Sequence, residues 1–276
     1  PHSFAIYSGR PAGKTSIMRM IERRLNDRLD AGMQPIVVPL YMDLHMDPPQ
    51  SSPDFFQRLL NRLDEWKEGT LGDLEPLPAL NDTAPATSFA DIFRELHRRT
   101  IPKLGGVKLA LLVDESEKLQ RPDWTNDLDD NLRALLSNKP GVTGNMSLGM
   151  TGRTGFYADM VDDHFGSPLR NILEEIKLPA CTQEEVLRLI NEPTEHKLPP
   201  DVADEVLRQA GGHLFLTQYL MRHIWEEGIE EANGQLVQDI VEEFPERRRD
   251  FETWKNSLGD SGCHVYAAMM QQNDVL

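Results

Sequence analysis

The amino-acid sequence predicts an α/β fold, in which a mostly parallel sheet with helices on both faces precedes a smaller, all-helical domain. Two observations carry this prediction. Up to about residue 179, short apolar strands alternate with stretches of helical periodicity, which is the pattern of right-handed crossovers in a parallel sheet. Beyond that point only helical periodicity remains. A chain of 276 residues is long enough for both parts.

The change of pattern predicts where the domains begin and end. We expect an α/β core over residues 1–179, a helical domain over 180–260, and the start of a further domain over 261–276. The first strand candidate, 4–7, stands almost at the beginning of the sequence, and a helical pattern over 265–270 stops near its end. Both features lead us to expect a fragment of a longer protein.

The individual elements follow from periodicity. Apolar runs predict strands over 4–7, 36–44, 107–113, 146–150 and 176–178. Helical spacing predicts helices that begin at Thr15 and that cover 55–66, 89–99, 128–136, 184–190, 202–209, 214–227 and 236–244. Pro39 indicates an edge strand or a bulge. The stretch 70–88, rich in Pro, Asp and Thr without periodicity, predicts a long surface loop.

Composition and charge exclude several classes of protein. The net charge of −16 argues against a general nucleic-acid binder, because such proteins present a basic face. No stretch approaches the apolar run of a membrane helix, and the first residues lack the features of a signal peptide. Cys181 and Cys263 match no metal-ligand or redox spacing. We therefore expect a cytoplasmic protein, with neither a membrane nor nucleic acid as a partner of this part.

Residues 8–15, SGRPAGKT, match a phosphate-binding loop of the form Gly-x4-Gly-Lys-Ser/Thr, except that Ser8 replaces the first glycine. The segment joins a strand to a helix, where backbone N–H groups and the positive helix end can hold phosphate oxygens. Lys14 would neutralise the outer phosphates, and the Thr15 hydroxyl would ligate magnesium. ATP and Mg²⁺ are the expected cofactors. The candidate nucleotide-binding residues of this segment are Gly9, Ala12, Gly13, Lys14, Thr15 and Ser16.

An acidic pair follows the apolar strand 107–113. Asp114 and Glu115 would lie at the carboxyl edge of the sheet, where ligands bind to open α/β folds. Asp114 would hold magnesium, and Glu115 would polarise the attacking water as a catalytic residue. A strand that ends in two carboxylates is common by itself. The phosphate loop earlier in the chain is what makes the pair a candidate site.

Two further residues are candidates, each with a structural alternative. Arg153 follows the strand 146–150, and we expect it beside Asp114, where its planar guanidinium could contact the third phosphate as a catalytic residue. Thr151 is the second choice, and a surface arginine in a glycine-rich turn is the alternative. His213 opens a helix after Gly-Gly and could reach the nucleotide from the second domain, although a histidine there is more often structural.

The order and spacing of four segments resemble the STAND class of signal-transduction ATPases, which are relatives of the AAA+ and archaeal ATPases. The segments are 13–16 (GKTS), 113–115 (VDE), 166–193 and 211–225. One departure is Ser8. A second is Leu214, which stands where such proteins usually have a proline after Gly-His.

The resemblance implies a molecular switch, in which nucleotide lies between the α/β core and a helical lid and slow hydrolysis resets the state. It also implies a homo-oligomer in the active form, with effector or sensor domains outside this sequence. Two alternatives stay open. One is a nucleotide-binding scaffold that never hydrolyses ATP. The other is an Orc-type, DNA-associated AAA+ ATPase, for which a DNA-binding domain would have to follow residue 276.

Overall fold

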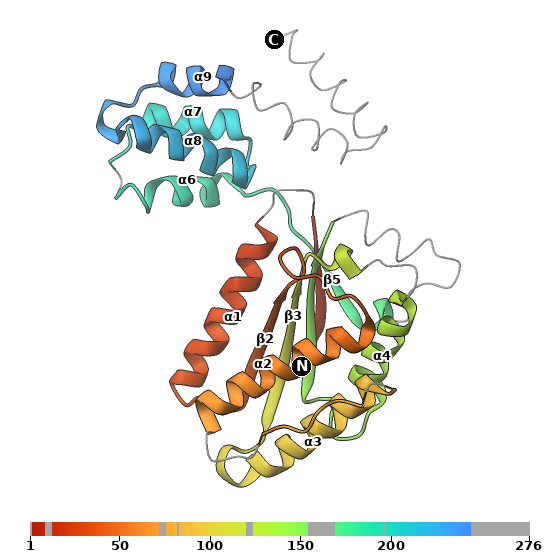
Figure 1. Cartoon of the computed structure of the whole chain (residues 1–276). Helices are drawn as coiled ribbons and strands as arrows, with labels where there is room; N and C mark the ends of the chain where they lie inside the picture. Colours follow the sequence, from red (N-terminus) through yellow and green to blue (C-terminus); the bar gives the residue numbers. More distant parts are fainter. Residues whose placement is uncertain are drawn as a thin grey trace. The chain divides into compact units, whose positions relative to one another are not determined.

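The computed structural model describes residues 2–8, 13–71, 76–81, 83–119, 124–153, 169–195 and 197–243. The chain forms two compact units (Figure 1). The first consists of Pro1–Tyr7 and Lys14–Lys177, and the second of Ser8–Gly13 and Leu178–Leu276. Each unit encloses its own hydrophobic core. Residues 244–276, which include the end of the predicted helical domain and the predicted further domain, lie outside the described residues.

A five-stranded parallel sheet forms the centre of the first unit, in the order β2-β3-β4-β1-β5. Its strands are β1 (Ser3–Tyr7), β2 (Ile36–Asp43), β3 (Val107–Asp114), β4 (Met146–Gly152) and β5 (Leu173–Lys177). Because all strands are parallel, their carboxyl ends meet at one edge of the sheet. The strand β4 lies between the strand that leads into the phosphate loop and the strand that carries the acidic pair.

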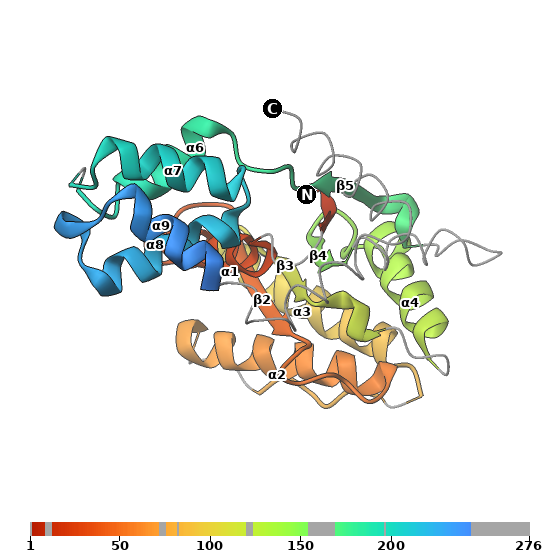
Figure 2. The same ribbon diagram turned by 90° about the horizontal axis from the view of Figure 1, so that it is seen from above.

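Helices cover both faces of this sheet (Figure 2). The helix α1 (Lys14–Asp30) packs on one face, against β2, β3 and β4. The other face is covered by α2 (Ser52–Leu71), α3 (Pro85–Leu104) and α4 (Thr125–Asn138). The strand β3 is buried along nearly its whole length, as expected of a central strand. The predicted α/β fold with helices on both faces is therefore confirmed.

The structure corrects the bounds of the predicted loop and of the last predicted strand. The expected loop 70–88 is shorter, because α2 continues to Leu71 and α3 begins at Pro85. Proline suits the first turn of a helix, where its missing N–H is not needed. The last strand is β5 rather than 176–178. It is an edge strand that pairs with β1, and its mostly exposed side chains give no apolar run. The strand that contains Pro39 lies at the opposite edge, as that proline indicated.

The described part of the second unit is helical. It contains α6 (Gln183–Asn191), α7 (Pro200–Ala210), α8 (Leu214–Glu227), the short 3-10 helix η3 (Ile229–Glu231) and α9 (Gly234–Glu243). A capping box between Thr182 and Glu185 fixes the start of α6. The apolar faces of the helices enclose the second core. Among the described helices of both units, none is long and apolar enough to cross a membrane.

Candidate nucleotide site

The predicted phosphate loop joins β1 to α1, as its motif requires. The strand ends at Tyr7, and the helix begins at Lys14. Two of the predicted loop residues, Gly9 and Ala12, lie outside the described residues. Gly13 has a φ angle of 79°, in the left-handed region that glycine adopts without steric cost. The backbone therefore turns sharply just before the helix.

Three predicted nucleotide-binding residues lie in the first turn of α1. Lys14 is the first residue of the helix and is only 7% exposed. Thr15 and Ser16 follow it in the first turn and are exposed. This turn contains no acidic residue, so the positive end of the helix dipole and the Lys14 charge act together. An anion such as a phosphate group is stabilised by that combination.

Asp114 is the last residue of β3 and is only 1% exposed. Both of its carboxylate oxygens accept hydrogen bonds. The Tyr41 hydroxyl donates to Oδ2 at 3.0 Å, while the Thr151 hydroxyl and the Glu115 amide donate to Oδ1, the latter at 3.1 Å. All three donors are neutral, and no ion pair joins Asp114 to another described residue. A buried carboxylate without a cationic partner is costly, so this position suits a bound cation.

Thr151 and the backbone of Glu115 complete the acidic end of β3. Thr151 is fully buried on β4, next to the end of β3, because Val113 pairs with Met150 in the register of the two strands. The Glu115 amide also donates to the Thr151 hydroxyl oxygen at 3.1 Å. Glu115 has a φ angle of 57°, which is uncommon for a residue with a side chain and is typical of functional sites. These hydrogen bonds hold the unusual backbone.

The residue of this segment that contacts Asp114 is Thr151, while Arg153 forms a different contact. The strand β4 continues to Gly152, so its register brings Thr151 to Asp114 and leaves Arg153 beyond the strand. Arg153 Nε instead forms an ion pair of 2.9 Å with Oε1 of Glu117, in the short helix η1 (Ser116–Leu119), and its side chain is 51% exposed. Its role toward the third phosphate stays a prediction.

His213 belongs to the second unit, where it is the N-cap residue of α8. Its carbonyl oxygen accepts hydrogen bonds from the Thr217 amide at 3.0 Å and from the Thr217 hydroxyl at 3.2 Å. The side chain is half-buried, and this burial lowers its pKa, so the imidazole favours the neutral form. Through its backbone, His213 thus caps the start of α8. A role toward the nucleotide stays a prediction.

Sequence reasoning missed Tyr41, which contacts Asp114, and Arg19, which contacts Tyr41. Tyr41 of β2 is 3% exposed, and Arg19 of α1 lies over its ring, with Cζ 3.6 Å from the ring centroid. Burial, followed by the negative charge of Asp114, raises the pKa of Tyr41, so the hydroxyl keeps its proton and acts as a donor. A signal was present in the sequence. A tyrosine in a buried strand usually needs a partner for its hydroxyl.

The residues at this edge fit a magnesium ion bound together with a nucleotide. Mg²⁺ is usually held by one or two carboxylates, by phosphate oxygens and by water, rather than by a cage of protein side chains. The described residues contain no cluster of three or more His, Cys, Asp or Glu side chains that could hold a metal ion. Asp114 supplies a carboxylate that no described cation neutralises, and Thr15 supplies an exposed hydroxyl.

Solved structures of initiator proteins are similar to this chain. The Aeropyrum pernix ORC1 protein in complex with DNA is 18% identical with a TM-score of 0.54, covering 88% of this chain and 60% of that one. The ORC2 protein of the same organism, in ADPNP-ADP complexes, is 14% identical with a TM-score of 0.58, covering 88% and 62%. Domain III of the Thermotoga maritima replication initiation protein DnaA is 18% identical with a TM-score of 0.50, covering 88% and 84%.

These similarities show the fold, which is the α/β fold of AAA+ P-loop ATPase domains. The chain spans about three fifths of the length of the ORC proteins that it matches. No protein-family model and no curated protein matches the sequence. One of the similar structures is a DNA complex, so these structures give no support to the expectation that nucleic acid is not a partner.

Proposed function

We propose that this chain is the nucleotide-binding domain of an AAA+ ATPase, which binds ATP with Mg²⁺ and hydrolyses it. One observation carries the proposal. Among the residues that the structure describes, those that hold the buried carboxylate of Asp114 at the carboxyl edge of the sheet are all neutral donors. The parallel strand β1 leads to the same edge, and Lys14 follows it as a buried cation at the start of α1. A magnesium ion would supply the cation that no described residue gives Asp114, and the phosphates would lie at the end of the helix that begins with the Lys14 charge.

Each residue would have a separate role. Lys14 would neutralise the outer phosphates, while backbone N–H groups from Gly9 to Ser16 would hold their oxygens. Thr15 and Asp114 would hold Mg²⁺, which spreads the negative charge of the phosphates when it is bound. Glu115 would orient a water molecule toward the γ-phosphorus and accept its proton as the bond to ADP breaks.

Arg153 and His213 have conditional roles in this proposal. Arg153 would contact the third phosphate only after leaving Glu117, to which it is bound in this structure. His213 would approach the nucleotide from the helical unit. Both residues would then report which nucleotide is bound, which is how a switch couples nucleotide state to conformation.

Among nucleotide-dependent proteins, an initiator-like ATPase is better supported than a STAND signalling switch, because the similar structures are ORC and DnaA proteins. Assembly into a homo-oligomer and slow, regulated hydrolysis are parts of the proposal that come from the sequence resemblance. The net charge of −16 opposes DNA contacts spread over the whole surface. Contact with DNA would require a local basic patch or further domains.

Replacement of Lys14 tests nucleotide binding. Lys14→Ala should abolish most of the ATP affinity, because it removes the charge that faces the phosphates, while circular dichroism shows an unchanged fold. Titration calorimetry with ATP in Mg²⁺ measures the effect. Lys103→Ala, which removes the same charge from an exposed position near the end of α3, should bind ATP like the wild type. Equal affinities of Lys14→Ala and Lys103→Ala would overturn the phosphate-loop assignment.

A further inference from the structure

Three neighbouring strands each place one polar side chain at the carboxyl edge of the sheet. These are Tyr41 on β2, Asp114 on β3 and Thr151 on β4, with exposures of 3%, 1% and 0%. Tyr41 pairs with Leu112 in the register of β2 and β3, so the alternation of side chains puts Tyr41 and Asp114 on the same face. Since all three residues are buried, water does not compete strongly for their hydrogen bonds.

Each hydroxyl and amide of this cluster has an acceptor within the described residues. A hydroxyl group donates one hydrogen bond and accepts others. The Tyr41 proton goes to Oδ2 of Asp114, the Thr151 proton goes to Oδ1, and the Thr151 oxygen accepts the Glu115 amide. Oδ2 therefore has a single described donor, the Tyr41 hydroxyl. Without that donor, Oδ2 of Asp114 would lose the hydrogen bond that fixes its direction.

Arg19, on the helix α1, lies over the ring of Tyr41. Its guanidinium carbon lies 3.6 Å from the ring centroid, within the range of a cation–π contact. Arg19 also donates to Glu22 Oε2 at 3.0 Å, which holds its side chain. Both residues belong to α1, the helix that begins with Lys14 and Thr15. The ring of Tyr41 thus lies between the acid of β3 and the helix that carries the predicted phosphate ligands.

We propose that Tyr41 is a positioning residue that holds the carboxylate of Asp114 in the direction required for a magnesium–nucleotide complex, with Arg19 fixing its ring. This inference rests on the proposed function, because it assigns a magnesium-binding role to Asp114. Tyr41 itself touches neither nucleotide nor metal in this scheme. It acts through Asp114, so its loss changes the contribution of Mg²⁺ to nucleotide affinity and leaves the contribution of the phosphate loop intact.

Tyr41→Phe removes only the hydroxyl and keeps the ring beneath Arg19. ADP affinity is measured by calorimetry twice, once with Mg²⁺ and once with EDTA, for the wild type and the variant. We expect the affinities in EDTA to agree, while the gain on adding Mg²⁺ falls about tenfold, the scale of one hydrogen bond to a charged group. Tyr219→Phe makes the same change in the helical unit, where the ring contacts Phe215 and His223, and should keep the full gain.

The outcomes separate this inference from the proposed function. If the wild type gains affinity with Mg²⁺ and Tyr41→Phe gains as much, Tyr41 does not position Asp114 while the nucleotide assignment stands. Equal losses with and without Mg²⁺ would also overturn the inference, because they indicate a general structural role. A wild type that binds no ADP would overturn both the proposed function and the inference.

A second variant keeps the test valid if Tyr41→Phe does not fold. Arg19→Gln leaves the hydroxyl in place and removes the cation from the ring. We expect the same pattern with a smaller effect, a two- to threefold loss of the magnesium-dependent gain, on the scale of an exposed cation–π contact. Thermal melting followed by circular dichroism measures the folded fraction of each variant. An unchanged gain in folded Arg19→Gln would overturn the role given to the Arg19 contact.

Discussion

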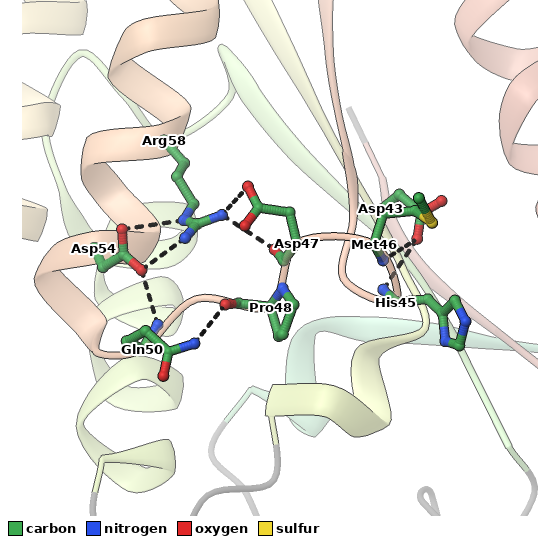
Figure 3. Close-up of polar contacts among 8 residues, drawn as sticks. All are labelled: Asp43, His45, Met46, Asp47, Pro48, Gln50, Asp54 and Arg58. Atoms are coloured by element: carbon green, nitrogen blue, oxygen red, sulfur yellow. Dashed lines mark hydrogen bonds and ion pairs between the residues drawn. The ribbon is translucent and has the colours of Figure 1, made fainter.

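Two polar networks near the carboxyl end of β2 differ in the charge of the groups that hydrogen-bond to their acidic side chains. In the turn after β2, Arg58 of α2 donates to both carboxylate oxygens of Asp54 at 3.0 Å and to the Asp47 carbonyl oxygen at 3.1 Å, and it also pairs with the Asp47 carboxylate (Figure 3). At the end of β3, the donors that Asp114 receives from the described part of the chain are all neutral. The first network neutralises its acids, and the second leaves a negative charge.

The difference indicates which acids are structural. Burial raises the pKa of Asp54, but hydrogen bonds from the Arg58 guanidinium and the Gln50 amide outweigh burial and lower it. Asp43, the register partner of Asp114, uses Oδ1 to accept the amides of His45 and Met46, which builds the turn shown in Figure 3. The acids near β2 therefore shape the backbone, whereas none of the described residues pairs a cation with Asp114, which leaves that carboxylate available to a ligand.

The largest expected effect tests this difference directly. Asp114→Asn should reduce magnesium-dependent ATP affinity by at least a factor on the order of a hundred, since even an outer partner of a metal ligand contributes about 10–100-fold. Asp54→Asn makes the same chemical change in the neutralised network and should leave ATP affinity unchanged. Calorimetry in Mg²⁺ measures both variants. If Asp54→Asn weakened ATP binding as much as Asp114→Asn, the distinction between a structural Asp54 and a ligand-binding Asp114 would be wrong.

Replacement of Glu115 tests whether the two residues of the acidic pair differ in role, with Asp114 in binding and Glu115 in hydrolysis. Glu115→Gln should preserve ATP binding and slow turnover on the order of a hundredfold, the usual scale for loss of a general base. Phosphate release under single-turnover conditions measures the rate, and calorimetry checks binding. Full wild-type turnover in the variant would remove Glu115 from the reaction. Absence of hydrolysis in the wild type, in the full-length protein with its trigger, would favour the non-hydrolysing scaffold.

The smallest expected effect concerns Arg58. Arg58→Ala should lower the free energy of unfolding by about 0.5–1 kcal/mol, because the ion pair is only partly buried, and should not change ATP affinity. The pKa of Asp54 is lowered in the folded state, so this contribution is present above pH 3.8 and is lost as the pH falls through the folded-state value. Urea unfolding at pH 7 and pH 3 measures it. If the free energies of unfolding of wild type and variant differed by the same amount at pH 7 and at pH 3, the stabilising role of the Arg58–Asp54 ion pair would be contradicted.

Much of the fold was readable from the sequence because its signals are local. The run 107–113 is apolar since β3 is buried on both faces, and the phosphate-loop motif lies within eight consecutive residues. The edge strand β5 gave only a partial signal, since its exposed residues include Glu174 and Glu175. The start of α3 was missed because its first turn, Pro-Ala-Thr-Ser, resembles a loop in composition.

The site was less readable because its contacts join distant segments. Lys14 and Asp114 belong to local motifs. The hydrogen bond from Tyr41 to Asp114 spans 73 residues, and the one from Thr151 spans 37. Such pairs depend on strand order and register, which no single segment specifies. Which side chain contacts Asp114 depends on where β4 ends, and the apolar run predicts an end at Met150, two residues before the strand ends at Gly152.

Where β1 pairs with β4, the glycine at position 149 leaves room for the ring of Phe4. Phe4 and Gly149 are register partners, and a Cβ atom at position 149 would lie 2.6 Å from Cζ of Phe4. The ring of Phe4 therefore occupies the space that any other residue at 149 would need. In evolutionary terms, the two positions should change together. A homologue with a side chain at position 149 should carry a smaller residue at position 4, and this covariation would identify relatives that keep Thr151 beside the strand of the phosphate loop.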